Sequence, residues 1–313
     1  DVASRVSSCL ATEFPSEGIE FRCGAVHSDA GTPDLSALLA AADLALARAK
    51  GHESGAFALD FWNDAHAAAL GSTAWRSLIE KALESDRYAL YAQPVVELPG
   101  RTLLHTEVFA RQMEDRGKAL AAATFMPMVA RHGLLPRFDV AIAEKLLATL
   151  DDSLSGKGRV AINVAAQTVA DAHAVEHLEN LLRAHPGVAS RLVFEMTEFG
   201  AASSPQATLS FAARMRALGA ACALDNFNMT RAGLALLPRL LPDYVKLAAE
   251  FTRGMRSSDE TEFLVTSLSR IAAPLEIQLI AQAVEDEATL ERLQALGVSG
   301  CQGHVSGVPA PLA

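Results

Sequence analysis

The sequence predicts an α/β protein whose larger part is a (β/α)8 barrel of the TIM type, preceded by a partial α/β segment. From Tyr88 onward, eight short apolar runs alternate with stretches of helical spacing, which is the element order of a barrel with a largely parallel sheet. This part of the chain has 226 residues, close to the roughly 250 that are typical of such a barrel. The full length of 313 residues leaves room for one barrel and a smaller segment before it.

The segment before the barrel has its own pattern. Residues 20–26 have the composition of a strand, residues 31–34 (Gly-Thr-Pro-Asp) suit a turn, and residues 35–50 show apolar residues at helical spacing until Gly51. A further helix is predicted over residues 75–83, leading into the barrel.

Polar residues mark the ends of the predicted barrel strands. The eight strands begin at Tyr88, Leu103, Arg159, Arg191, Ala221, Tyr244, Glu276 and Val298. Seven polar residues fall at or near their carboxyl ends: Glu107, Asn163, Glu195, Asp225, Lys246, Gln282 and Gln302. Because barrel proteins assemble their sites from these strand ends, we expect the seven side chains to meet at one rim.

Composition limits the classes of function. The net charge of −10 argues against a DNA-binding protein, because duplex binding depends on many Lys and Arg contacts to phosphates. The apolar stretch at residues 37–49 is too short to cross a membrane and carries Asp43 and Arg48. The four cysteines lack the spacing of a zinc site or a disulfide framework, which favours the reducing cytoplasm. The chain opens with Asp1, so we interpret it as part of a longer protein.

Several motifs from about Ser72 to Leu312, taken in order, resemble those of the EAL-domain proteins, which hydrolyse or bind cyclic di-GMP. They are Gln93-Pro94-Val95-Val96, Glu107-Val108-Phe109-Ala110-Arg111, Ile162-Asn163-Val164, Glu195-Met196-Thr197-Glu198, Asp225-Asn226-Phe227-Asn228, Asp243-Tyr244-Val245-Lys246, Gln282-Ala283-Val284-Glu285, and Gln302-Gly303 with Pro309. Residues 41–50 resemble the last half of a GGDEF domain, although the chain lacks the GG[DE]EF signature. We therefore expect residues 1–62 to be the C-terminal part of a degenerate GGDEF-like domain, 63–82 a linker helix, and 83–313 a degenerate EAL domain.

The resemblance implies a reaction whose residues are incomplete here. EAL enzymes cleave a phosphodiester with water held between two Mg²⁺ or Mn²⁺ ions, which need several carboxylates. Asn226 and Gln282 stand where the family has acids, and each amide deletes a negative charge. Lys246 and Glu285 are retained, and Glu107, Asn163, Glu195 and Asp225 remain as residual metal ligands. We expect no catalytic residues and no bound metal. Lys246 can equally form a structural ion pair with Glu195 or Asp225.

Ligand binding requires less than hydrolysis. By resemblance, the residues that hold cyclic di-GMP are Gln93, Glu107, Arg111, Asn163, Asp225, Gln302 and Pro309. The sequence thus predicts an inactive receptor that needs no cofactor and relays occupancy to a partner domain or a second protomer, as in receptors of the LapD and FimX kind that act in biofilm or adhesion signalling. Such a receptor would be the cytoplasmic part of an inner-membrane protein anchored upstream.

Two alternatives stay open. One is a weak phosphodiesterase that uses Mg²⁺ or Mn²⁺, and the other is an interaction scaffold that binds no nucleotide. His105, His132 and His304 lack ligand spacing and are interpreted as ordinary core or surface residues.

Overall fold

The computed structural model describes residues 23–27, 42, 57–61, 72–85, 87–113, 119–120, 122–152, 158–255 and 258–312. The chain divides into two compact units, one of residues 1–88 and 111–134 and the other of residues 89–110 and 135–313. The two units are described separately below.

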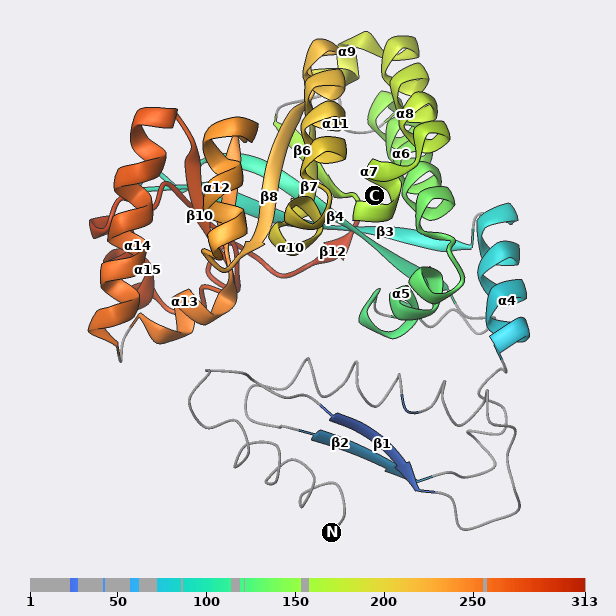
Figure 1. Cartoon of the computed structure of the whole chain (residues 1–313), viewed down its shortest axis with the longest axis horizontal. Coiled ribbons are helices and arrows are strands. Elements are labelled where there is room, and N and C mark those ends of the chain that lie inside the picture. Colours follow the sequence, from blue (N-terminus) through green and yellow to red (C-terminus); the bar gives the residue numbers. More distant parts are fainter. Residues whose placement is uncertain are drawn as a thin grey trace. The chain divides into compact units, whose positions relative to one another are not determined.

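Among its described residues, the first unit contains a small parallel sheet and the helices α4 (Ser72–Glu84) and α5 (Ala122–Arg131). Strands β1 (Cys23–His27) and β2 (Phe57–Phe61) pair in parallel, and β1 lies within the strand predicted from residue 20 (Figure 1). Helix α4 confirms the helix expected over residues 75–83, and α5 follows a two-residue strand, β5 (Ala119–Leu120). The helix predicted over residues 35–50 lies outside the described residues except for Ala42.

The second unit is a closed barrel, which confirms the predicted fold class. Its strands follow the order β3-β11-β10-β9-β8-β7-β6-β4, and pairing between β3 and β4 closes the ring. They are β3 (Tyr88–Glu97), β4 (Leu103–Met113), β6 (Arg159–Asn163), β7 (Leu192–Thr197), β8 (Ala221–Phe227), β9 (Tyr244–Leu247), β10 (Gln278–Ala281) and β11 (Gly300–Cys301). A short last strand, β12 (Ala310–Pro311), pairs with β3.

One strand departs from a uniform (β/α)8 pattern. The pairs from β4 through β6, β7, β8, β9 and β10 to β11 are all parallel, but β11 pairs with β3 antiparallel. The connection from β3 to β4 is a turn in which the Arg101 amide donates to the Glu97 carbonyl and the Glu97 amide donates to the Thr102 carbonyl. A link this short joins antiparallel strands, since a parallel crossover needs a dozen residues or more.

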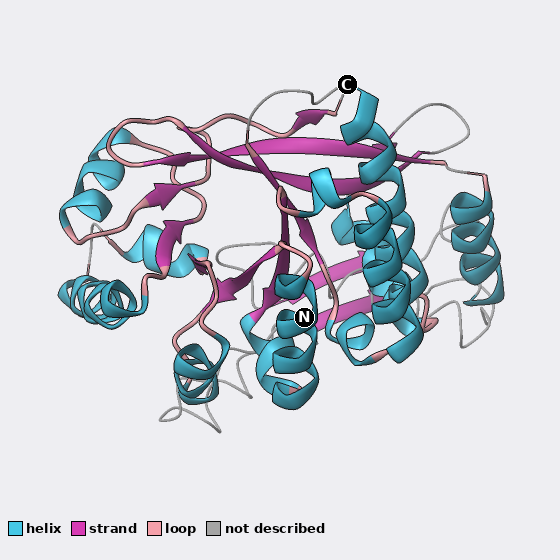
Figure 2. Ribbon diagram, turned by 90° about the horizontal axis from the view of Figure 1, so that it is seen from above, coloured by secondary structure: helices cyan, strands magenta, loops and turns pink. Residues whose placement is uncertain are grey.

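Helices lie outside the ring of strands, as Figure 2 shows from above. They are α6 (Leu135–Asp152), α7 (Ala166–Ala170), α8 (Ala172–Ala184), α9 (Pro186–Ala189), α10 (Glu198–Ser203), α11 (Pro205–Ala217), α12 (Arg231–Leu240), α13 (Ala249–Gly254), α14 (Asp259–Ala272), the 3₁₀ turn η1 (Ala273–Leu275) and α15 (Glu287–Ala295). None of the helices in the described part of the chain is long and apolar enough to cross a membrane.

The barrel interior is filled by side chains from alternate positions of the strands. Its apolar core joins Val95, Ala161, Val193, Ala221, Ala223, Tyr244 and Ile280. In a strand, residues two positions apart face the same side, so the polar residues at the carboxyl ends continue these inward rows. The core therefore forms the floor on which the polar strand ends stand.

Candidate functional site

A cavity of about 670 Å³ lies at the carboxyl ends of the barrel strands. It lies within the range of roughly 300 to 1,000 Å³ that small-molecule pockets occupy. Six of the seven residues predicted to bind ligand line it: Gln93, Glu107, Asn163, Asp225, Gln302 and Pro309. Asn226, Gln282 and Glu285 line it as well, as do Phe109, Thr197, Ala249, Ala283, Gly303 and His304.

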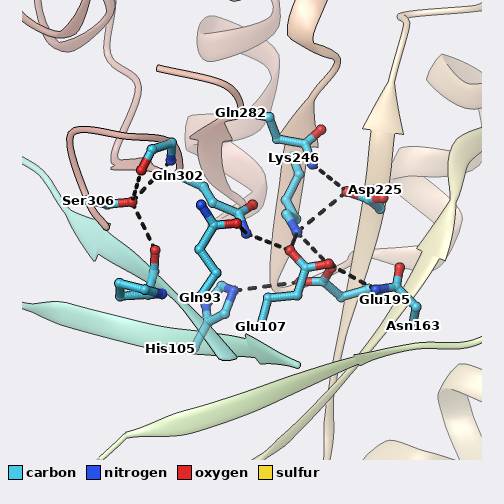
Figure 3. A network of polar contacts seen from close by, with 12 residues as sticks. Gln93, His105, Glu107, Asn163, Glu195, Asp225, Lys246, Gln282, Gln302 and Ser306 are labelled. Atoms are coloured by element: carbon cyan, nitrogen blue, oxygen red, sulfur yellow. Dashed lines mark hydrogen bonds and ion pairs between the residues drawn. The ribbon is translucent and has the colours of Figure 1, made fainter. Parts of the chain in front are cut away.

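Lys246 lies at the centre of the acidic strand ends (Figure 3). Its side chain is fully buried, and its Nζ is 2.5 Å from Glu107 Oε2, 2.7 Å from Glu195 Oε2 and 3.5 Å from Asp225 Oδ1. The ion pair expected from the sequence is thus present, and it includes Glu107 as well. One cation is shared among three carboxylates that come from three different strands.

Burial and charge act in opposite directions in this cluster. Burial alone would raise the pKa of Glu107, but the Lys246 charge and three hydrogen bonds bring that pKa below its ordinary value. Burial and the neighbouring Glu107 carboxylate raise the pKa of Glu195 well above its ordinary value, and burial also raises the pKa of Asp225. Burial would lower the pKa of Lys246, yet the surrounding acids outweigh it and raise that pKa. Glu107 and Lys246 therefore form the firmest ion pair.

Side-chain amides surround Glu107. Asn163 Nδ2 donates to Glu107 Oε1 at 2.9 Å, and Gln302 Nε2 donates to Glu107 Oε2 at 2.7 Å. Gln302 also approaches Gln93 Oε1 at 3.3 Å, while Gln93 Nε2 donates to the Gly307 carbonyl at 2.9 Å. Both ends of the Gln93 amide are thus engaged within the protein, which links the buried carboxylate to the loop after β11.

The two amides that replace acids differ in their surroundings. Gln282 Nε2 donates to Asp225 Oδ1 at 2.9 Å, a bond that an ionised Glu at this position could not make because it has no proton to donate. Asn226 is exposed and has a positive φ of 50°, a conformation that Asn adopts more readily than most residues. Gln282 therefore converts a contact between two acids into a hydrogen bond.

This donor set does not fit a pair of divalent cations. Lys246 Nζ occupies the space between Glu107, Glu195 and Asp225, and Gln282 presents an N–H rather than an oxygen to Asp225. Across the described residues, no group of three or more His, Cys, Asp and Glu side chains is arranged to hold a metal ion. Two hard cations in contact need several carboxylates, and two of those have become amides.

The loop after Asp225 and Asn226 is anchored by a buried acid, Glu198. Its carboxylate accepts from the Asn228 amide at 2.5 Å, from the Thr230 amide at 2.8 Å and from the Thr230 hydroxyl at 2.6 Å. Gly233 makes room for it, because a Cβ there would lie 1.8 Å from Glu198 Oε1. Met229 within this loop has a positive φ of 58°, although the chain has no glycine at that position.

Two histidines that the sequence analysis interprets as ordinary core or surface residues lie near the site. His105 is buried two residues before Glu107 on β4, with its Nε2 3.6 Å from Glu195 Oε1. Burial lowers the pKa of His105 to about 3, so the ring is neutral. His304 lines the cavity at its rim, with its Nδ1 3.9 Å from Glu285 Oε1. The sequence signal for a place of His304 at the site is its position directly after Gln302-Gly303, a motif predicted to lie there.

Arg111 lies four residues beyond Glu107 on β4 and is half-buried. It belongs to the first unit, whereas the cavity belongs to the second. Its contact with ligand stays a prediction.

Curated proteins match about three quarters of this chain. The cyclic di-GMP phosphodiesterase PdeB of Shewanella oneidensis is 28% identical over 242 residues, which cover 76% of this chain and 28% of that protein. PdeF of Escherichia coli, also a cyclic di-GMP phosphodiesterase, is 26% identical over 236 residues, covering 75% of this chain and 31% of PdeF. The chain thus spans about a third of the length of these curated relatives.

Solved structures match over similar or greater lengths. The S helix-GGDEF-EAL part of Vibrio cholerae LapD bound to c-di-GMP superposes with a TM-score of 0.83 and 25% identity, covering 97% of this chain and 72% of that one. The FimX EAL domain of Xanthomonas citri, in complex with c-diGMP, gives a TM-score of 0.72 at 20% identity, covering 80% and 98% of the two chains. The EAL domain pattern matches residues 76–309, and the chain therefore belongs to the EAL domain family.

Proposed function

We propose that this chain is an EAL-domain receptor that binds cyclic di-GMP without hydrolysing it. The observation that carries the proposal is that amides stand where the resemblance implies acids: Gln282 Nε2 donates to Asp225 Oδ1 at 2.9 Å, and Asn226 lines the same cavity. The cavity still has the size and the polar lining that suit a nucleotide. The LapD and FimX structures that resemble this chain hold the same dinucleotide.

The charge balance of this cluster suits an anionic ligand better than a pocket lined by ionised acids alone would. Lys246 offsets one carboxylate, and the raised pKa values of Glu195 and Asp225 make both acids easier to protonate. Less negative charge means less repulsion of the two phosphates of the ligand. Gln93, Glu107, Arg111, Asn163, Asp225, Gln302 and Pro309 remain the proposed contacts, with no metal required.

The relay of occupancy is a second part of the proposal. Ligand binding would shift the population between two arrangements of the barrel and its neighbours, whether a GGDEF-like segment before residue 63, a second protomer or a partner protein. The superposition with LapD extends over 97% of this chain, which supports an amino-terminal segment of that kind. We propose that the whole protein is anchored upstream in the inner membrane, with this part in the cytoplasm.

The competing function is a weak phosphodiesterase, which the names of the curated relatives favour. Purified protein should be incubated with cyclic di-GMP and Mn²⁺, and the nucleotide analysed after binding has been measured in the same sample. We expect binding and intact ligand. Release of the linear dinucleotide at enzymatic rates contradicts the receptor, and no binding by folded protein favours a scaffold.

Arg111→Ala tests one contact of the site, with Arg239→Ala on the exposed face of α12 as the charge-matched control. We expect loss of at least tenfold in affinity for the first and no change for the second, because an Arg–phosphate pair is charge-assisted and bidentate. Unchanged affinity in Arg111→Ala removes Arg111 from the site.

A further inference from the structure

The loop after β11, which we call the closing loop (residues 303–309), forms part of the cavity wall through Gly303, His304 and Pro309. It continues an antiparallel pairing in which Gly300 lies opposite Glu97 and Cys301 opposite Val96. Gly303 lies two residues after Cys301 and Pro94 lies two residues before Val96, so both residues fall just beyond the last pair of this register.

The Gly303 carbonyl is engaged within its own loop, where it accepts from the Ser306 and Gly307 amides at 3.1 Å each. The Ser306 hydroxyl bridges the closing loop and β3 (Figure 3). It accepts from the Gly303 amide at 3.0 Å, and it lies 2.9 Å from the Pro94 carbonyl and 3.0 Å from the Gly303 carbonyl, to either of which it can donate. A side chain three residues further along thus joins the two backbones.

The closing loop has little freedom to take another position. A Cβ at Gly303 would lie 2.2 Å from the Val284 carbonyl oxygen, and one at Gly307 would lie 2.9 Å from Pro94 Cγ. Gly307 also accepts a hydrogen bond from Gln93 at 2.9 Å. The loop is therefore packed backbone to backbone on one side, and Ser306 and Gln93 hold it on the side of β3.

We propose that Ser306 is a positioning residue of the ligand cavity: its hydroxyl bridges the Gly303 amide to the Pro94 carbonyl of β3, and so holds His304 and Pro309 in the cavity wall. This inference rests on the proposed function in one respect, that the wall it positions receives cyclic di-GMP. Ser306 itself is absent from the cavity lining, so its effect on affinity acts through the loop.

The test compares Ser306→Thr with Ser306→Val, which have the same shape and differ only in the hydroxyl. Calorimetric titration with cyclic di-GMP should give affinity about tenfold weaker for the Val variant than for the Thr variant, the usual worth of one hydrogen bond. Equal affinity in the two variants overturns the proposal.

A second readout keeps the proposal testable without ligand. Amide hydrogen exchange of Gly303 in ligand-free protein should be about tenfold faster in the Val variant than in the Thr variant, because the amide loses its acceptor. If wild-type protein binds no cyclic di-GMP, the receptor fails, and exchange alone decides whether Ser306 holds the loop. If exchange differs while affinity does not, the hydroxyl is purely structural and the positioning role is wrong.

Discussion

The inner and outer halves of the cavity differ in how their polar groups are stabilised. In the inner half, Glu107, Glu195 and Lys246 are buried and form a compact ion cluster. In the outer half, Gln282 is a neutral amide, and the charged Glu285 is 69% exposed. Buried charges require partners inside the protein, whereas exposed ones are solvated by water.

The difference shows how hydrolysis and binding can separate. A metal pair would need carboxylates in the outer half, where Gln282 presents an amide. Replacing the outer acids by amides leaves the inner cluster balanced by Lys246. The cavity can therefore keep its shape without cations, and each half predicts its own response to mutation.

The largest effect is expected in the inner half. Lys246→Met leaves Glu107 and Glu195 buried without a counter-charge and should lower the free energy of unfolding by about 3 to 5 kcal/mol. Denaturant unfolding measures it, with Lys81→Met on the exposed side of α4 as the control. Adding Glu107→Gln to Lys246→Met should recover part of the loss. A loss below about 1 kcal/mol would mean that the cluster is not held by this lysine.

A buried acid outside the cluster sharpens the comparison. Asp139 on α6 accepts from the Ala165 amide at 2.8 Å and from the Thr168 hydroxyl at 2.5 Å, and burial raises its pKa to about 6. Since the folded state then binds a proton more tightly than the unfolded state, whose carboxyl titrates near 3.8, this group stabilises the fold as pH falls through 6.

The full contribution of Asp139 is on the order of 3 kcal/mol between pH 7 and pH 4. Asp139→Asn should remove that pH dependence, so wild type gains stability relative to the variant on acidification. Urea unfolding of both proteins at several pH values measures it. Curves that stay parallel from pH 7 to pH 4 contradict the raised pKa.

Changes in the outer half come next. Gln282→Glu places a carboxylate beside Asp225 and should lower the unfolding free energy by about 1 to 3 kcal/mol in chelator. Together with Asn226→Asp, it should make stability rise on addition of Mn²⁺, because the added acids supply metal ligands. Thermal unfolding with EDTA and with Mn²⁺ measures both effects. If Mn²⁺ stabilises the wild type as strongly as the double variant, the amides at positions 226 and 282 are not what weakens metal binding.

The smallest effect is expected at the rim. Glu285 and His304 are 3.9 Å apart and each is 69% exposed, so Glu285→Gln should change the free energy of unfolding by less than about 0.5 kcal/mol. Thermal denaturation checks it. A loss of unfolding free energy as large as that in Gln282→Glu would mean that the Glu285 carboxylate depends on a partner in the protein rather than on water.

Much of the barrel could be predicted because its strands are apolar runs between helices of amphipathic spacing. All eight strands were located, yet Gln282 and Gln302 fall one residue beyond β10 and β11. The antiparallel direction of β3 was not predicted, although the sequence Leu-Pro-Gly-Arg-Thr between two strands is a turn signal.

The positions of the polar residues at the strand ends could be predicted from the sequence, but their hydrogen-bond partners could not. The partner of Gln282 is Asp225, 57 residues away, and that of Gln302 is Glu107, 195 residues away. Such pairs depend on barrel closure, which no local pattern encodes. Ser306 was missed for the same reason, since its hydroxyl bonds the Pro94 carbonyl on a distant strand.

The central proposal is that the site binds cyclic di-GMP without cations and without hydrolysing it. Its most direct test is the affinity for cyclic di-GMP, measured by calorimetry in EDTA and again in excess Mn²⁺, with the recovered nucleotide analysed. The account predicts affinities within about twofold of each other, since no metal takes part in binding, and intact ligand in both samples. Binding that is tenfold tighter in Mn²⁺, or conversion to the linear dinucleotide, would contradict it.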